Sequence, residues 1–270
     1  MIPKIIHYVW LGKTPLPEKT VRCIDSWKRY CPDYEIIEWN EDNINLDSCL
    51  YAKQAYKARK WAFVSDYVRL FALERFGGIY LDTDVEILRP LDSFLSLKCF
   101  LGFESSKGVA TCIMAAEKGH SFIHELMREY DGISFAESHG IYDLTTNVTR
   151  VTRQAIRHGL KLNNEKQTVC DCTVFPRDYF CPLNIDTGVL ECSENTFAIH
   201  WLSGSWKSEK EKRIRNSANR LRRTLQHPFG TPVAAIYELS SKVFCVIHEE
   251  GIFSVCSRIR MYFRKNKALK

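Results

Sequence analysis

The chain has 270 residues, of which 45% are hydrophobic, 12% aromatic and 26% charged. This composition supports a folded core and excludes a chain that is disordered over most of its length. The formal net charge is +6, but residues 258–270 hold six basic and no acidic residues, which leaves 32 basic against 32 acidic residues elsewhere (38 − 6 = 32). The basicity therefore indicates an anionic partner for the C-terminal segment and argues against a nucleic-acid-binding body.

The first elements predict a β-α-β unit. Residues 4–10 form a short apolar run that indicates a buried strand. A helix is expected over about 18–30, with Val21, Ile24 and Trp27 at helical spacing and a stop before Pro32. Residues 35–39 predict a second strand. This opening is typical of an α/β protein with a parallel sheet.

The next elements continue the alternation. A helical pattern over 52–76 ends at Gly77-Gly78, a strand is expected over 79–88, another over 100–103, and a helix near 121–130. Residues 131–192 read as irregular, and the segment after 206 as basic and helical. We therefore expect two parts, a catalytic domain over 1–206 and a basic helical extension over 207–270.

The predicted strand over 79–88 contains Asp82-Thr83-Asp84. Side chains alternate faces along a strand, so Tyr80, Asp82 and Asp84 are expected to point the same way. Two carboxylates at the carboxyl end of a strand can share one hard cation, which suits an anionic diphosphate leaving group. The alternative is an ordinary solvated turn, because acidic residues are common.

Other residues give this pair a context. Asp66 and Arg69 share a face of the preceding helix, where a surface ion pair is the alternative interpretation. Trp10 ends the first strand and offers a ring for stacking on a base, or else a core residue. Near residue 206, further groups suit ligand binding: a metal-ligating imidazole, a hydroxyl and an indole N–H, from His200, Ser205 and Trp206.

Several motifs agree in order and spacing with a known family. They are His7-Tyr8-Val9-Trp10-Leu11-Gly12, Ser65-Asp66-Tyr67-Val68-Arg69, Phe76-Gly77-Gly78-Ile79-Tyr80-Leu81-Asp82-Thr83-Asp84-Val85, and His200 with Ser205-Trp206. Together they resemble glycosyltransferase family 32 over about residues 2–206. The resemblance implies a GT-A-type nucleotide-sugar-binding fold, a mixed and mostly parallel sheet flanked by helices, with the C-terminal helical extension outside the pattern.

The resemblance also implies residue roles. Asp82 and Asp84 are expected to ligate a divalent metal, Mn²⁺ or Mg²⁺, with His200 as a third ligand. Asp82, Asp84 and Arg69 are the expected catalytic residues. The donor nucleotide-sugar is expected to contact a wider set: Trp10, Ser65, Asp66, Arg69, Tyr80, Asp82, Ser205 and Trp206.

The expected reaction is metal-dependent transfer, with retention of configuration, of a sugar from a nucleotide-diphosphate sugar. UDP-sugars are favoured as donors over GDP-mannose, and the acceptor is a hydroxyl of a surface glycan or a lipid-linked oligosaccharide. The alternatives are a toxin-like transferase that modifies a protein hydroxyl and an inactive binding module. A carboxylate nucleophile stays open among Glu104, Asp143 and Asp186, and we favour a same-face mechanism without one.

Targeting and cysteine patterns predict the location. The N-terminus lacks an apolar signal-peptide core, and no run reaches the roughly 18 apolar residues of a membrane span. The 11 cysteines include no C-x-x-C pair, and no histidine follows Cys170 and Cys172 at the spacing of a zinc finger, so a structural zinc site is not expected. Free thiols in a reducing cytoplasm are expected instead. An apolar stripe through Ile252, Val255 and Ile259 beside the basic residues suggests contact with an anionic membrane surface, or a helix docked on the core.

Overall fold

A computed structural model describes residues 1–106, 108–136, 142–185, 187–204, 213–214 and 217. One compact unit comprises Met1–Ile185 and Val189–Trp206. Nearly all of the basic segment over 207–270, including the predicted stripe through Ile252, lies outside the described residues. The division at residue 206 therefore stays a prediction.

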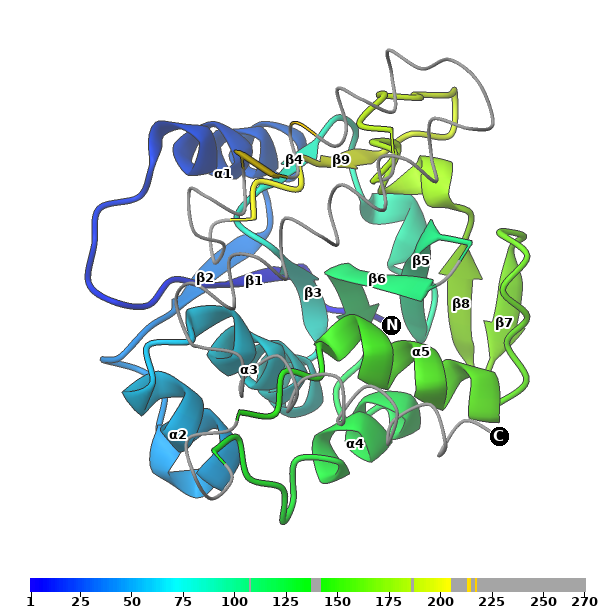
Figure 1. Ribbon diagram of the computed structural model, residues 1–270. Coiled ribbons are helices and arrows are strands. Elements are labelled where there is room, and N and C mark those ends of the chain that lie inside the picture. The colour runs from blue at the N-terminus through cyan, green and yellow to red at the C-terminus, as the bar shows by residue number, and fades with distance from the viewer. Residues whose placement is uncertain (107, 137–141, 186, 205–212, 215–216, 218–270) are drawn as a thin grey trace. The chain divides into compact units, whose positions relative to one another are not determined.

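A seven-stranded sheet forms the centre of this unit (Figure 1). Strands β2, β1, β3, β5 and β8 run in one direction, and β6 and β7 oppose them. The order across the sheet is β2 (Glu35–Trp39), β1 (Ile5–Val9), β3 (Gly78–Leu81), β6 (Gly108–Ala116), β5 (Cys99–Ser105), β8 (Cys172–Phe175) and β7 (Gln167–Val169). The predicted α/β class with a mixed, mostly parallel sheet flanked by helices is confirmed.

Helices cover both faces of the sheet (Figure 1). Along β3, Tyr80 packs into the core beneath α2 to α5, whereas Ile79 and Leu81 pack into the core beneath α1. This alternation is what a strand covered on both faces requires. The helices are α1 (Glu18–Tyr30), α2 (Leu50–Lys57), α3 (Trp61–Phe76), α4 (Ser121–Arg128) and α5 (Asn147–Arg157).

The β-α-β opening is as predicted. Helix α1 begins after Pro17 and ends at Tyr30, two residues before Pro32. Its Trp27 is fully buried, and the indole Nε1 donates a hydrogen bond of 2.7 Å to the Val85 carbonyl. Helix α1 is therefore fixed to the start of β4 (Val85–Ile87), and Ile24 and Trp27 of the predicted apolar spacing are buried, whereas Val21 is exposed.

The single helix expected over 52–76 is wrong, because the chain forms two helices there. Between α2 and α3, Arg59 has a φ of 54°, and this left-handed conformation interrupts the ladder of helical hydrogen bonds. Nothing in the sequence marks the break, since no glycine or proline stands at it. A short 3₁₀ helix (Leu46–Ser48) precedes α2.

The strand expected over 79–88 is also divided. Strand β3 ends at Leu81, and β4 (Val85–Ile87) leaves the central sheet to pair with β9 (Ala198–His200) in a two-stranded sheet. Asp82, Thr83 and Asp84 form the turn between them, closed by a 3.0 Å hydrogen bond from Val85 N–H to the Asp82 carbonyl. The carboxylates thus lie on a turn, not on a strand.

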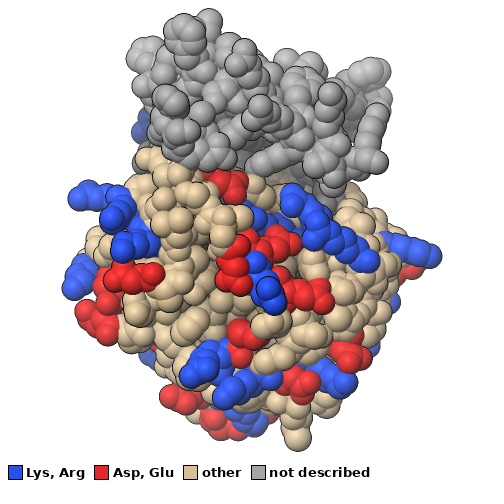
Figure 2. All heavy atoms as spheres, turned by 90° about the horizontal axis from the view of Figure 1, so that it is seen from below, with Lys and Arg blue, Asp and Glu red and all other residues tan. Residues whose placement is uncertain are grey.

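The segment over 131–192, expected to be irregular, contains α5, β7 and β8. Two further 3₁₀ helices lie at Asp92–Phe94 and Arg177–Tyr179. Among the described residues, no helix has the length and apolar character to cross a membrane. Figure 2 shows acidic and basic side chains interspersed over the visible face of the described part.

Candidate functional site

The carboxyl ends of β1 and β3 form one edge of the sheet. The two strands are parallel, with His7 opposite Tyr80, so Trp10 and Thr83 each lie three residues further along. His7 is fully buried, and its Nε2 lies 2.8 Å from the Gly77 carbonyl. This contact joins the end of α3 to β1. It places the predicted stacking tryptophan and the Asp82–Asp84 turn at the same edge.

The predicted metal ligands come together at that turn. Ligand atoms of Asp82, Asp84 and His200 all lie within 4.8 Å of one another. His200 reaches the turn because the β4–β9 pairing sets it opposite Val85. The juxtaposition agrees with the prediction, but its cause is the turn and the second sheet, not alternation along one strand.

The donor set fits a divalent cation. Two carboxylates and one imidazole suit Mn²⁺ or Mg²⁺ better than a thiophilic ion. The Asp82 and Asp84 side chains keep 27% and 19% of their surface exposed, which leaves access for an ion and a ligand. Backbone contacts hold the turn, since Asp82 N–H donates to the Cys112 carbonyl at 2.8 Å.

Asp84 is held as a carboxylate. Burial by itself would raise its pKa, but His200, whose Nε2 lies 3.3 Å from Asp84 Oδ1, and the Ser203 N–H, which donates to Oδ2 at 2.7 Å, lower the pKa below its usual value. The group is therefore charged at neutral pH, as a metal ligand must be.

Arg69 contacts the carboxylates of both Asp66 and Asp82. Its guanidinium lies 3.0 Å from Asp66, 3.1 Å from Asp82 and 2.6 Å from the Thr111 carbonyl, and 4.5 Å from the centroid of the Tyr80 ring. Only 5% of the Arg69 side chain is exposed. The alternative of a surface ion pair is therefore wrong. Tyr80 completes the group, because its hydroxyl donates to Asp82 Oδ1 at 2.9 Å.

Asp66 lies deeper than the metal turn. Its Oδ2 accepts a 3.1 Å hydrogen bond from the Asn147 N–H at the start of α5, and the Asn147 side chain donates to the Asp66 carbonyl at 3.2 Å. Burial raises the pKa of Asp66 to about 6, although Arg69 opposes the shift. Asn147 was not predicted as a site residue, because the sequence pattern indicates no helix at this position.

Two further predicted donor-site residues are placed by local contacts. The Ser65 hydroxyl donates to the Ala62 carbonyl at 2.8 Å and accepts from Arg69 Nη2 at 3.1 Å. Trp10 is half-buried, and its indole Nε1 donates to the Thr14 carbonyl at 2.6 Å. Trp10 is thus not wholly enclosed in the core, and part of its surface is accessible at the sheet edge.

The other predicted site residues either lie outside the described residues or are held by contacts away from the metal turn. Ser205 and Trp206, the predicted diphosphate contacts, lie outside the described residues, as does Asp186. Asp143 is engaged by Arg150, whose Nη2 lies 2.5 Å from Asp143 Oδ2. Glu104 lies on β5, within the central sheet.

Part of the chain that contains the site matches a known family model. Residues 17–101 match a family model described as a glycosyltransferase sugar-binding region containing a DXD motif. This segment holds Asp66, Arg69, Asp82 and Asp84, and the match confirms the resemblance predicted from these motifs. His200 lies beyond it.

Named relatives agree with this match. The chain is 33% identical over 142 residues to inositol phosphoceramide mannosyltransferase 3 of Schizosaccharomyces pombe. The aligned region covers 50% of this chain and 38% of that protein. The chain is 24% identical over 216 residues to an uncharacterized glycosyltransferase of Acanthamoeba polyphaga mimivirus, covering 74% of this chain and 85% of that protein. The chain therefore spans well under half the length of the yeast relative.

Two solved structures are similar at lower levels. PaToxG glycosyltransferase is 21% identical with a TM-score of 0.46, covering 58% of this chain and 68% of the other. A glycosyltransferase involved in glycosylation of the major capsid of PBCV-1 is 11% identical with a TM-score of 0.44, covering 81% of this chain and all of the other (100%).

Proposed function

Because this chain carries the glycosyltransferase sugar-binding region that contains a DXD motif, we propose that it is a glycosyltransferase that moves a sugar from a nucleotide-diphosphate sugar to a hydroxyl group. The observation that carries the proposal is the grouping of Asp82, Asp84 and His200 within 4.8 Å. This grouping stands beside the buried Asp66–Arg69 pair, so the turn has both a place for a cation and a rigid support.

The residues of the turn support a metal-dependent transfer. Asp82 and Asp84 would hold a divalent cation, Mn²⁺ or Mg²⁺, and His200 is within reach as a third ligand of the same ion. When bound, that cation supplies Lewis-acid neutralisation of the departing diphosphate. Arg69 keeps the Asp82 carboxylate aimed at the ion through its 3.1 Å contact, and the exposed part of Trp10 stacks on the donor base at the sheet edge.

The donor-side residues hold the sugar. Asp66, Arg69 and Tyr80 form a buried polar wall behind the turn, and we assign the ribose and the donor sugar to it, with Ser65 fixing the orientation of Arg69. Ser205 and Trp206 are assigned to the diphosphate from the sequence motif. These residues bind and orient, because glycosyl transfer through an oxocarbenium-like state needs positioning as well as charge neutralisation.

Transfer is proposed to retain the anomeric configuration by a same-face route without a covalent intermediate. Asp143 supports this, since its carboxylate is occupied by Arg150 and is a poor nucleophile in that state. The test is mass spectrometry of the enzyme quenched during turnover. A trapped glycosyl-enzyme adduct would contradict the same-face route and leave the transferase assignment unaffected.

The donor and acceptor are proposed by class. UDP-sugars remain our sequence-based choice, whereas the names of the yeast relatives bring mannose donors into consideration. Those names also specify an inositol phosphoceramide acceptor, which supports a lipid-linked acceptor for this chain over a free glycan. A place in the cytoplasm, at the inner face of the plasma membrane, is proposed from the sequence alone. Such an enzyme would serve polysaccharide or capsule biosynthesis.

A protein hydroxyl is the second candidate acceptor. A relative from Legionella pneumophila, 27% identical over 158 residues, is named Subversion of eukaryotic traffic protein A, and a name of that kind fits a transferase that acts on host proteins. Assaying the same donor with lipid-linked glycans and with protein extracts separates the two candidates. Sugar incorporated into protein alone would favour the toxin-like function.

Donor hydrolysis tests the core of the proposal. Purified chain is incubated with a panel of UDP- and GDP-sugars and Mn²⁺, and free sugar is measured. Turnover with at least one donor should be abolished by EDTA and lowered about a hundredfold or more in Asp82→Asn and Asp84→Asn, the scale on which one preorganised electrostatic group acts. The control Asp42→Asn changes an exposed carboxylate and should keep full activity. Equal turnover in all three variants would refute the site.

A further inference from the structure

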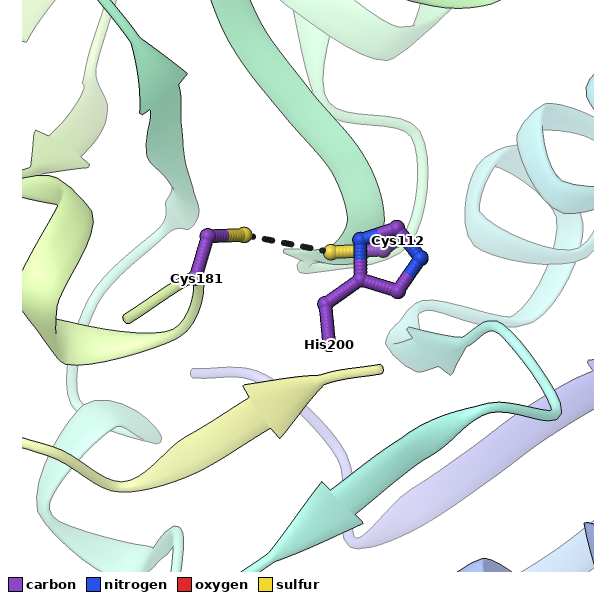
Figure 3. Close-up of side chains that lie close together, drawn as sticks. All are labelled: Cys112, Cys181 and His200. Atoms are coloured by element: carbon purple, nitrogen blue, oxygen red, sulfur yellow. Dashed lines mark hydrogen bonds between the residues drawn. The ribbon is translucent and has the colours of Figure 1, made fainter. Parts of the chain in front are cut away.

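A second group of metal-ligating side chains lies behind the Asp82–Asp84 turn. Cys112 comes from β6, Cys181 from the segment after the 3₁₀ helix Arg177–Tyr179, and His200 from the end of β9 (Figure 3). Their ligand atoms lie within 4.8 Å of one another, and the two sulfurs are 3.5 Å apart. Both cysteines are buried free thiols.

The imidazole of His200 faces two ways. Its Nε2 lies 3.3 Å from Asp84 Oδ1. Its Nδ1, the nitrogen drawn beside the Cys112 sulfur in Figure 3, is buried, and the structure gives it no well-formed hydrogen bond. The Cys112 thiol, a weak hydrogen-bonding group, is the neighbour that interacts with His200 there. A cation between Nδ1 and the two sulfurs would satisfy this buried nitrogen better than a thiol does.

We propose that Cys112, Cys181 and His200 form a binding site for a thiophilic divalent cation, of which Zn²⁺ is the type. Two thiolates and one imidazole are a ligand set that Zn²⁺ accepts in proteins, with a fourth position left to water or another ligand. The proposal goes beyond the transferase function and stands on ligands of a different chemical class from the paired carboxylates.

The spacing of the sulfurs suits a tetrahedral ion. With Zn–S bonds of about 2.3 Å, two thiolates of a tetrahedral centre lie about 3.8 Å apart, close to the 3.5 Å observed. Disulfide formation would require the sulfurs to approach to about 2.05 Å. Binding is not a redox step: the ion takes up two sulfur lone pairs and one nitrogen lone pair, and the two thiol protons, with the Nδ1 proton of His200 where the imidazole is charged, are released to solvent.

The contact with Asp84 supports the assignment. A histidine that ligates zinc commonly donates its other ring N–H to a carboxylate, which fixes the tautomer. With Nδ1 on the zinc, the Nε2–H of His200 donates to Asp84 in this way. A neutral imidazole has one lone pair, so His200 cannot ligate a metal at both sites at once. When zinc occupies the cysteine site, a cation at the Asp82–Asp84 turn would be held by the two aspartates and by oxygens of the nucleotide-sugar donor.

Another cysteine pair provides a contrast. Cys99 and Cys172 face each other across β5 and β8 with their sulfurs 3.0 Å apart. Among the described residues they join no group of three metal-ligating side chains. Proximity of two buried thiols therefore does not by itself create a site, and the Cys99 thiol is a matched control.

The test uses the reduced full chain, stripped of metal and titrated with Co²⁺ and with Zn²⁺. Wild type should bind one Zn²⁺ at this site and show cobalt–thiolate charge-transfer absorption. Cys112→Ser and Cys181→Ser should each weaken binding more than about a hundredfold, since loss of an outer partner alone costs about 10- to 100-fold. Cys99→Ser should match wild type, and circular dichroism checks that each variant folds.

Two outcomes would overturn the proposal: no thiolate band in the wild-type protein, or an undiminished band in both Cys112→Ser and Cys181→Ser. If one variant fails to fold, the wild-type titration and the other variant still decide. Asp84→Asn separates this site from the transferase site. It should lose Mn²⁺-dependent donor hydrolysis and keep the cobalt–thiolate band at saturating Co²⁺, so failure of one proposal is distinguishable from failure of the other.

Discussion

At the scale of single residues, the polar contacts of the site converge on Arg69. Its guanidinium contacts Asp66, Asp82 and the Thr111 carbonyl. Burial would lower the pKa of Arg69, but the neighbouring Asp82, Tyr80 and Asp66 raise it above its usual value. Arg69 is therefore a permanent positive charge that holds two carboxylates close together in the absence of a metal.

Replacing Arg69 with alanine should destabilise the fold as well as the site. Removing one partner of a buried ion pair costs about 3–5 kcal/mol, and the lower end applies here because Asp82 is partly exposed. Urea unfolding of the metal-free protein measures the change. Arg22→Ala is the control, since its pair with Glu18 is exposed and contributes about 0.5 kcal/mol or less. Equal losses in both variants would contradict the role of Arg69.

Asp66 should make stability depend on pH. Its pKa of about 6 exceeds the usual 3.8, so the folded protein binds this proton more tightly than the unfolded chain does. Its contribution to stability therefore falls as pH rises from about 4 to about 6, by roughly 3 kcal/mol for a shift of about two units, and is constant above that range.

Urea unfolding of wild type and Asp66→Asn in EDTA, over pH 4 to 7, tests this sign. The free energy of unfolding of wild type minus that of the variant should decrease with rising pH and then level off. A difference that rises with pH would mean that Arg69 and the Asn147 N–H stabilise the carboxylate more than burial disfavours it.

At the scale of elements, the junction of α3 and β3 sets the position of the metal turn. Gly77 ends the helix with a φ of 69°, and Gly78 begins the strand with a φ of 106°. A Cβ on Gly78 would lie 2.7 Å from the Ile5 carbonyl oxygen. Only glycine lets β1 and β3 approach closely enough to align Trp10 with the turn.

Gly78→Ala should therefore separate the two strands. We expect a loss of about 2–4 kcal/mol, the sum of left-handed strain and the clash with backbone, together with weaker Mn²⁺ binding. Gly119→Ala is the matched control, because Gly119 has a φ of 70° but nothing within 4 Å of its added Cβ. It should show only the strain of about 1–2 kcal/mol. Thermal unfolding and Mn²⁺ titration of both variants measure the effect of the clash. If Gly78→Ala loses no more stability than Gly119→Ala and binds Mn²⁺ equally well, the close approach of β1 and β3 does not determine the site.

Some elements were predictable because local signals agree with the tertiary structure. Helix α1 has an apolar stripe, a proline before it and a proline after it, and its bounds match the prediction residue for residue. Helix α5 was missed because its apolar residues are few and it also buries polar residues, including Asn147, Arg150 and Gln154. Two signals were available: Val148, Val151 and Ala155 at helical spacing, and the N-cap Thr146.

The site was predictable as a set of residues but not as a geometry. Asp82 and Asp84 were recognised by their motif, whereas the turn that carries them depends on β4 leaving the central sheet, which no local signal marks. The Cys112–Cys181–His200 group was missed for a related reason. Its members come from three distant segments, so no short spacing in the sequence marks them.

At the scale of the whole molecule, the net positive charge is concentrated in the C-terminal segment. Removing residues 252–270 should reduce association with anionic vesicles and preserve activity on a soluble acceptor. Each basic residue near an anionic surface contributes about 1 kcal/mol, and salt should weaken the binding by screening.

Vesicle co-sedimentation at low and high salt, beside an assay with soluble acceptor, measures both effects. Neutral vesicles are the control and should bind neither form strongly. If truncation leaves sedimentation unchanged and lowers activity on every acceptor, the segment is packed on the enzyme instead of binding the membrane.

The pairing of β4 with β9 also determines when the site can form during folding. It brings Asp84 against Ser203, 119 residues away in the sequence, and such distant contacts form late in folding because a long loop must close first. A chain emerging from the ribosome carries both aspartates long before it carries His200. The closed turn therefore forms only when the fold is complete, and a fragment ending at residue 101 would hold the motif without the strand that closes it.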